Sequence, residues 1–183
     1  MTNFDIVVLG GGSGGYVSAI RSAQLGNKTA VIEKDELGGV CLNWGCIPTK
    51  ALLKSAEILN YIKNSKQFGI NVSKYDIDFL QTVKRSRNVS KRLSKGIEFL
   101  MKKNKIKHII GQGIIQSTSE ISVTNGNKKQ KIVAKKIIIA TGGRPKEFPG
   151  VEFDGKKIIT SKEAMTLDSP PAKLVIIGAG AIG

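Results

Sequence analysis

Acidic residues are scarce in this sequence: 14 aspartates and glutamates stand against 29 lysines and arginines, and the formal net charge is +15. Such an excess favours nucleic acid or anionic membranes as partners when it gathers on one surface. Here the basic residues are scattered, with the densest stretches at 84–92 and 102–107. We interpret the charge as a solvated, lysine-rich surface. A nucleic-acid binder stays an alternative that no recognition motif supports, so no nucleic-acid partner is expected.

Long apolar runs and targeting segments are missing as well. The first apolar run, Phe4–Leu9, is far too short to span a membrane and is followed at once by glycines. No secretory signal and no transit peptide rich in arginine and serine precede it. We therefore expect a cytoplasmic protein with no membrane partner. An apolar fraction of 40% is adequate for a packed core.

Cysteine and histidine are nearly absent, and this excludes a closed zinc site, which needs four ligands. The chain has two cysteines, Cys41 and Cys46, and one histidine, His108. We expect no metal, and we interpret His108 as an ordinary strand residue. In a reducing compartment, two cysteines so close together indicate redox chemistry more than a structural crosslink. Two buried, inert cysteines are the alternative.

The apolar runs and glycines that are present predict an α/β fold. Short buried strands are expected at Phe4–Leu9 and Thr29–Glu33, with a helix at Tyr16–Leu25 between them. This strand–helix–strand order implies parallel strands. The later patterns predict a loop at 34–40, helices at about 47–62 and 78–104, strands at 106–111, 136–140 and 173–177, and a hairpin turn at Asn125-Gly126.

The second long helix carries an apolar stripe that we interpret as its core-facing side, with the basic residues on its solvated face. The members of the stripe are Phe79, Leu80, Val83, Val89, Leu93, Ile97, Leu100 and Met101.

A glycine-rich loop follows the first predicted strand and fits Gly-x-Gly-x-x-Gly. Its first glycine permits a tight turn, its second lets backbone N–H groups approach a pyrophosphate, and its third allows close packing of helix on strand. Glu33 ends the next strand, where a carboxylate can accept hydrogen bonds from ribose hydroxyls. The pattern predicts dinucleotide binding and leaves FAD and NAD open. The candidate loop residues are Gly10, Gly12, Ser13, Gly14 and Gly15.

The spacing of the cysteines restricts the backbone around them. Five residues along a regular helix separate two Cα atoms by about 8–9 Å, whereas a disulfide needs less than about 7 Å. If Cys41 and Cys46 are bonded, residues 41–46 are not a regular helix. Gly45 tolerates distortion and Pro48 is comfortable only in a first turn, so the regular helix is expected to start close to Cys46. The positive end of that helix favours a thiolate.

The segment 38–53, GGVCLNWGCIPTKALL, resembles the redox-active segment of the flavoprotein disulfide reductases. Its Leu-Asn and Ile-Pro-Thr-Lys-Ala-Leu-Leu are most similar to the dihydrolipoamide dehydrogenase branch. The resemblance covers nearly the whole chain through FDIVVLGGGSGGYVSAIRSAQLG, GIEFLMKKNKI with the following GQG, IIIATGGRP and LVIIGAGAIG. It implies a Rossmann-like FAD-binding domain with a parallel sheet, long helices and a small antiparallel β insertion, followed by the start of a second Rossmann-like domain.

The resemblance also implies a role for each matching residue. Cys41 would be the interchange thiol that meets a dithiol substrate, and Cys46 would lie against the flavin. Lys50, one helical turn later, would sit near the reactive nitrogen of the flavin. Glu33 would bind the adenosine ribose of FAD. The other expected FAD-binding residues are Lys34, Gly38, Gly39, Val40, Cys41, Gly113, Thr141 and Gly142, and the expected NAD-binding residues are Gly178, Gly180 and Gly183.

These matches imply residues 1–150 as an FAD-binding domain with a redox-active disulfide, 151–172 as a connector, and 173–183 as the first strand and glycine loop of an NAD-binding domain. With no domain around it, we expect Leu174–Gly183 to be poorly ordered or loosely packed. The family's catalytic His-Glu pair lies on a C-terminal dimerisation domain, and His108 is not in that motif. The chain is therefore expected to be incomplete for turnover.

The implied activity is oxidation of protein-bound dihydrolipoamide through the disulfide and FAD, with electrons passed to NAD. The implied partners are the lipoyl domain of a 2-oxoacid dehydrogenase or glycine cleavage complex, and a second copy in a homodimer. Two alternatives stay open: a glutathione-, mercuric- or thioredoxin-type flavin reductase, and a non-catalytic FAD-binding module.

Overall fold

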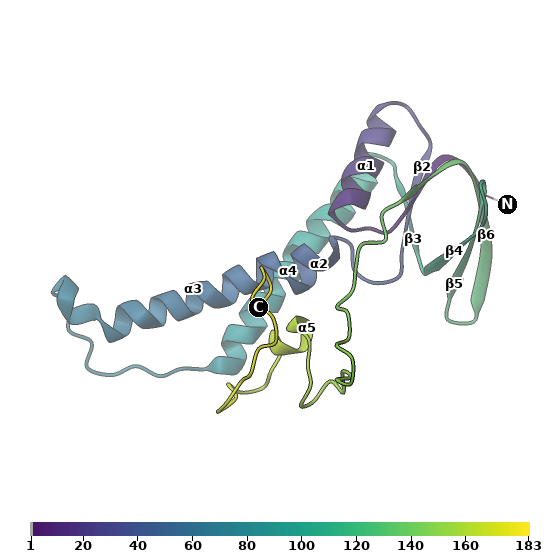
Figure 1. Ribbon diagram of the computed structural model, residues 1–183. Helices are drawn as coiled ribbons and strands as arrows, with labels where there is room; N and C mark the ends of the chain where they lie inside the picture. The colour runs from purple at the N-terminus through teal and green to yellow at the C-terminus, as the bar shows by residue number, and fades with distance from the viewer. Residues whose placement is uncertain (1) are drawn as a thin grey trace. The chain divides into compact units, whose positions relative to one another are not determined.

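A computed structural model describes residues 2–183 (Figure 1). The chain divides into two compact units. The first comprises the residues up to Asn43 together with Lys91–Arg144, and the second comprises Trp44–Ser90 together with Pro145–Gly183.

A six-stranded sheet forms the centre of the first unit, in the spatial order β3-β2-β1-β6-β5-β4. Strands β3, β2, β1 and β6 are parallel neighbours, whereas β5 and β4 continue the sheet in antiparallel fashion. The predicted α/β class and the predicted first strands are therefore confirmed. The bounds are β1 (Thr2–Leu9), β2 (Thr29–Glu33), β3 (Lys107–Ile110), β4 (Gln112–Ser117), β5 (Glu120–Asn125) and β6 (Lys128–Ile139).

The central strands bury side chains on both faces of the sheet. Successive residues of a strand point to opposite faces, so Val7 and Ile32 enter one core while Val8 and Val31 enter the other. The first core is completed by β3, β5 and β6, and the second by the helices. Figure 1 shows α1 (Ser13–Gln24) beside β1 and β2. Burial on both faces explains why these strands read as continuous apolar runs.

The predicted hairpin is also present. Strands β5 and β6 pair antiparallel as far as Asn125 and Lys128, and Gly126 takes a positive φ of 55° between them. Strand β6 is longer than the predicted 136–140 because its first half pairs with β5 and its second half pairs with β1. One strand thus joins the antiparallel and parallel parts of the sheet.

The predicted long helices are confirmed to within a few residues of their ends. The helical elements after α1 are α2 (Gly39–Trp44), α3 (Cys46–Lys63), the short 3-10 turn η1 (Ser65–Phe68), α4 (Phe79–Lys103) and α5 (Ser161–Ala164). The first two residues of α2, Gly39 and Val40, lie inside the predicted loop. Within residues 2–183, none of the helices combines the length and the apolar character that a bilayer crossing requires.

The predicted core stripe of α4 is confirmed only in part, since Phe79, Val83 and Val89 are half-buried and three of its leucines are exposed. Ile97 and Met101 are buried, but Leu80 is 57% exposed and Leu93 is 40% exposed. The residues buried over the preceding turns are serines at four-residue spacing: Ser86, Ser90 and Ser94. A serine can be buried at such positions because its hydroxyl bonds to backbone carbonyls; Ser86 Oγ donates to Val83 O at 2.7 Å, and Ser94 Oγ donates to Leu37 O at 2.9 Å.

The predicted strand at 173–177 is absent. Residues 173–179 have no regular structure, and Val175 is 86% exposed. The physical reason is that a strand needs a neighbour to satisfy its backbone N–H and C=O groups. No strand pairing in the described chain includes these residues.

Candidate redox and nucleotide-binding site

The glycine loop between β1 and α1 is held in a tight turn. Gly10 has a φ of +105°, and its N–H donates to Ile32 O at 2.8 Å. A Cβ at Gly10 would collide with the carbonyl of Ala140, and a Cβ at Gly15 would collide with the carbonyl of Gly10. Both positions therefore need glycine, as the motif predicted.

The other side of the loop is open. A Cβ at Gly12 would meet only Gly39 Cα, at 3.6 Å, and a Cβ at Gly14 would meet nothing within 4 Å. Helix α1 begins after Gly12 with no side-chain cap and no acidic residue in its first turn. The first N–H groups of a helix have no acceptor within it. The arrangement fits an anionic pyrophosphate lying against the N-terminus of α1.

Glu33 lies against this loop. Its Oε2 accepts the N–H of Gly11 at 2.7 Å, and its Oε1 accepts the N–H of Asp35 at 2.9 Å. A carboxylate has about four acceptor positions, so these two bonds fix the side chain and leave positions for further donors such as ribose hydroxyls.

The segment after β2 folds back over the glycine loop. Gly38 is buried and its N–H donates to Gly11 O at 2.9 Å. A Cβ at Gly39 would lie 2.7 Å from Gly12 Cα, so the first residue of α2 touches the loop directly. The helix that carries Cys41 thus begins beside the predicted pyrophosphate site. Lys34 and Val40 of the same segment are exposed.

Two residues that had no predicted role support this segment. Asn43 is 1% exposed, and its Nδ2 donates to Leu37 O at 3.0 Å and to Gly39 O at 3.2 Å. Ser94 of α4 donates to the same Leu37 carbonyl. The sequence signal for Asn43 was the Leu-Asn of the family resemblance, which gave it no role.

Both cysteines are disulfide-bonded, and the chain contains no third cysteine. Cys41 lies in α2 and Cys46 begins α3, and both are exposed. The helical path breaks at Gly45, with φ −149° and ψ −116°. The expectation that bonded cysteines interrupt a regular helix is therefore confirmed, as is the start of the regular helix at Cys46.

The start of α3 suits a reactive sulfur. Its first turn has no acidic residue and no side-chain cap, and Pro48 is buried there. Proline lacks an N–H, so it is well placed where the helix has no acceptor to offer. Lys50 lies one turn after Cys46, and both side chains are exposed. The positive end of the helix stabilises a thiolate at Cys46.

The remaining candidates fall in two groups. Gly113 of β4 packs against β1 and β2, since a Cβ there would lie 2.5 Å from a Leu9 methyl group. Thr141 follows β6, and its Cα lies 3.1 Å from where a Gly10 Cβ would be. Thr141 therefore lies beside the glycine loop, whereas Gly113 lies against strand residues of the sheet. Gly142 is exposed beside Thr141, whereas Gly178, Gly180 and Gly183 belong to the second unit and are exposed.

His108 lies in β3, as predicted for an ordinary strand residue. Burial lowers the pKa of His108, and the nearby carboxylates of Glu98 and Glu33 oppose that shift. Its Nε2 is buried without a hydrogen-bond partner within the described chain. No group of three or more potential metal ligands occurs among residues 2–183.

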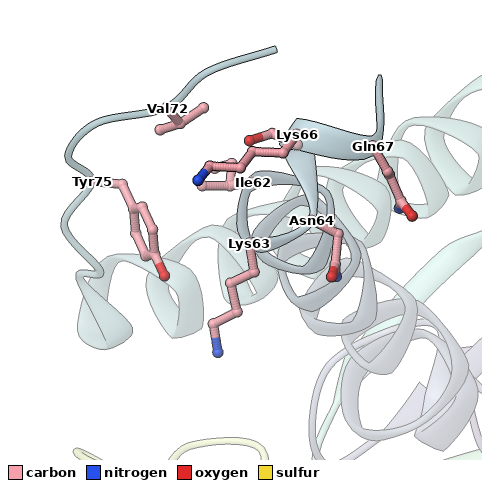
Figure 2. A pocket seen from close by; sticks show the side chains of 8 residues that line it. Ile62, Lys63, Asn64, Lys66, Gln67, Val72 and Tyr75 are labelled. Carbon is pink, nitrogen blue, oxygen red and sulfur yellow. The ribbon is translucent and has the colours of Figure 1, made fainter. Parts of the chain in front are cut away.

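One further hollow lies away from these residues, at the end of α3. Figure 2 shows Ile62 and Lys66 on one side and Val72 and Tyr75 on the other. None of the predicted site residues lines it.

The fold and the site together define a dinucleotide-binding protein with an exposed disulfide at a helix N-terminus. The family model described as pyridine nucleotide-disulphide oxidoreductase matches residues 4–183. The chain belongs to this family.

Curated relatives agree along the whole chain. It is 48% identical to a dihydrolipoyl dehydrogenase of Chlorobaculum parvum, covering 98% of this chain and 39% of the relative. It is 46% identical to a dihydrolipoyl dehydrogenase of Bacillus subtilis, covering 100% of this chain and 40% of that protein. A mitochondrial dihydrolipoyl dehydrogenase of Pisum sativum is 48% identical, covering 98% and 36%. The chain thus spans about two fifths of the length of the curated relatives it matches.

Proposed function

We propose that this chain is the FAD-binding and disulfide-bearing part of a dihydrolipoyl dehydrogenase. The observation that carries the proposal is the disulfide-bonded pair, exposed at a helix break in a chain whose relatives bear that name. In this proposal the protein oxidises protein-bound dihydrolipoamide, and the electrons pass through the disulfide and FAD to NAD.

The residues of the first unit fit a bound FAD. The open face of Gly12 and Gly14 and the start of α1 would accept the pyrophosphate. Glu33 would accept hydrogen bonds from the adenosine ribose, because its carboxylate is already oriented by two backbone N–H groups. We assign the same site the remaining predicted contacts of this unit: Gly10, Ser13, Gly15, Lys34, Gly38, Gly39, Val40, Cys41, Gly113, Thr141 and Gly142. The predicted flavin contact of Lys50, in the second unit, rests on its position one helical turn after Cys46.

Each of the two cysteines would have its own role in thiol–disulfide exchange with the substrate. A thiolate of dihydrolipoamide attacks the exposed sulfur of Cys41, and the electron pair of the S–S bond moves to Cys46, which the start of α3 stabilises as a thiolate. Attack by the second substrate thiol then releases oxidised lipoamide and leaves both cysteines reduced. Two electrons and two protons have been transferred from the substrate. A flavin held by the residues named above would supply the two-electron acceptor chemistry needed to return the two cysteines to the disulfide.

The rest of the assignment concerns the longer protein. Gly178, Gly180 and Gly183 would begin the NAD site, with 151–172 as connector and 173–183 as the first part of that domain. A lipoyl domain of a 2-oxoacid dehydrogenase or glycine cleavage complex would be the substrate partner, and a homodimer would be the working assembly.

The test is an anaerobic visible spectrum of the purified chain with FAD, before and after dihydrolipoamide. We expect a flavin band that the dithiol bleaches, and we expect Cys46→Ser to bind FAD but lose this dithiol-dependent reduction. Dithionite serves as the control, because it reduces bound flavin without the disulfide. A flavin band that is bleached equally in Cys46→Ser would contradict the proposed relay. If dihydrolipoamide reduces the bound flavin neither in the parent chain nor in Cys46→Ser, a non-catalytic FAD-binding module is favoured.

A further inference from the structure

The single tryptophan of the chain lies under two cations. Trp44 is the last residue of α2 and is half-buried. The guanidinium carbon of Arg87, on α4, is 4.1 Å from the centre of its ring. The Nζ of Lys162, on α5, is 4.6 Å from the same ring centre. All three residues belong to the second unit.

Such contacts hold a charge in place. A cation within about 6 Å of an indole face is attracted by the ring, and the attraction is stronger when the cation is desolvated. Both contacts are within that distance. Without the ring, long Arg and Lys side chains would keep their charges in solvent.

Trp44 lies close to Cys46 in the sequence. Only Gly45 separates Trp44 from Cys46, so the two Cα atoms are at most about 7 Å apart. The ring that contacts the two cations is thus attached to the backbone directly before the first turn of α3. That turn contains no acidic residue.

We propose that Trp44 is a positioning residue that holds Arg87 and Lys162 near Cys46, so that their charges stabilise the Cys46 thiolate after the disulfide is reduced. The inference rests on the proposed redox role of the pair. Reduction by a dithiol delivers two electrons and two protons to Cys41 and Cys46. The Cys46 thiol then releases its proton to solvent, and the clamp (Trp44, Arg87 and Lys162) makes that release easier.

The other charged groups on the elements that carry the clamp do not reverse this sign. Lys50 on α3 adds a further positive charge. Arg85 on α4 is also positive and donates to Ala51 O at 2.9 Å. The acidic neighbour on α5, Glu163, is engaged by the N–H of Thr160 at 2.9 Å. Among these named groups and the two stacked cations, the positive charges outnumber the one carboxylate.

The experiment measures the thiol at Cys46 alone, in a Cys41→Ser background, by the rate of alkylation with iodoacetamide between pH 5 and 10. Arg87→Gln and Lys162→Gln each remove one charge from the clamp, and Trp44→Leu removes the ring. We expect each to move the midpoint of the rate profile to higher pH and to slow alkylation at pH 7, about threefold or more for Arg87→Gln, which corresponds to half a pH unit. Arg87→Lys and Trp44→Phe should retain most of the rate.

The matched control is Lys84→Gln, which removes a charge from an exposed position of the same helix without touching the ring. The proposal is overturned if Arg87→Gln and Lys84→Gln give the same alkylation rate profile, whether or not both profiles are shifted from that of the Cys41→Ser parent. Far-ultraviolet circular dichroism checks folding, and if Trp44→Leu unfolds, the two glutamine variants decide the question.

A second measurement separates this inference from the proposed function. With both cysteines present, the reduction potential of the disulfide should become more negative in Arg87→Gln than in Lys84→Gln, since the reduced state loses a stabilising charge. The difference should shrink at high salt. Neither measurement requires FAD, so both can be interpreted even if the flavin experiment fails. An unchanged reduction potential in Arg87→Gln would contradict the role of the clamp and would leave the proposed function untouched.

Discussion

The chain contains the same glycine motif twice, at Gly10–Gly15 and at Gly178–Gly183, and the two copies have different surroundings. Their turns are alike: the first glycine has φ +105° in one copy and +122° in the other. In both, a Cβ on the last glycine would collide with the carbonyl of the first. Yet the first copy follows strand β1, whereas residues 173–177 before the second copy have no regular structure.

The difference shows which part of the motif is local. The turn forms in both copies because glycine backbones fit it without help from the rest of the protein. The flanking strand forms only where partners exist: β1 pairs with β2 and β6 and buries Val7 and Val8 completely. Val175, in the second copy, is 86% exposed. A strand is therefore a property of the sheet, whereas the turn is a property of the sequence.

Amide hydrogen exchange should separate the two copies most widely. The amides of residues 6–9 open only with the sheet, so we expect them to exchange about a thousandfold or more slowly than those of 174–177. Strong protection of the amides from exchange throughout 174–183 would mean that the second copy forms stable hydrogen-bonded structure, which would contradict the contrast. Exchange followed by NMR or mass spectrometry measures both segments in one sample.

Matched truncations of the flanking isoleucines should differ strongly. Ile32 is 1% exposed and Ile177 is 71% exposed. We expect Ile32→Ala to lower the free energy of unfolding by about 2–5 kcal/mol, and Ile177→Ala to change it by less than about 0.5 kcal/mol. Urea denaturation compares the two variants, and similar losses would contradict the contrast.

Matched substitutions of the first glycines test the turn itself. Gly10→Ala places a Cβ against the Ala140 carbonyl at a positive φ, whereas Gly178→Ala meets nothing within 4 Å. We expect Gly10→Ala to cost about 2–4 kcal/mol from strain and overlap. Gly178→Ala should leave global unfolding unchanged, because its strain of about 1–2 kcal/mol stays local. A thermal unfolding scan of both variants is sufficient.

Glu33 distinguishes the first copy by its bonds to Gly11 and Asp35. Glu33→Gln keeps one acceptor oxygen, so we expect a loss of about 1–2 kcal/mol in the free energy of unfolding, together with weaker FAD binding. Fluorescence titration with FAD checks the second effect. Glu36→Gln, at an exposed position, is the control for the loss of one negative charge. An equal loss of stability and of FAD affinity in Glu36→Gln would argue against a specific role of Glu33.

The smallest expected effect is the titration of His108 at the edge of the sheet. Burial places its pKa below the ordinary 6.5 in the folded chain. The unfolded state then binds the proton more readily, so stability is present above about pH 6.5 and falls as the pH drops below it. Urea midpoints between pH 5 and 8 should show this slope in the parent chain and lose part of it in His108→Gln.

Sequence patterns predicted the elements that repeat a strong local signal. The strands at Phe4–Leu9 and Thr29–Glu33, the helix break before Cys46 and the hairpin after Asn125 each follow from residues adjacent in the chain. The family resemblance of the sequence is confirmed by the match to the family model. The roles assigned to individual residues remain proposals.

What the sequence determined by itself is the set of local conformations: glycine turns, helix starts and the distortion that two close cysteines impose. Only the tertiary structure decided which faces and segments are buried. Serines rather than the apolar stripe fill the buried side of the first half of α4, and the apolar run at 173–177 stays exposed without a sheet. Burial depends on partners distant in the chain, and no periodicity within one segment can specify whether those partners are present.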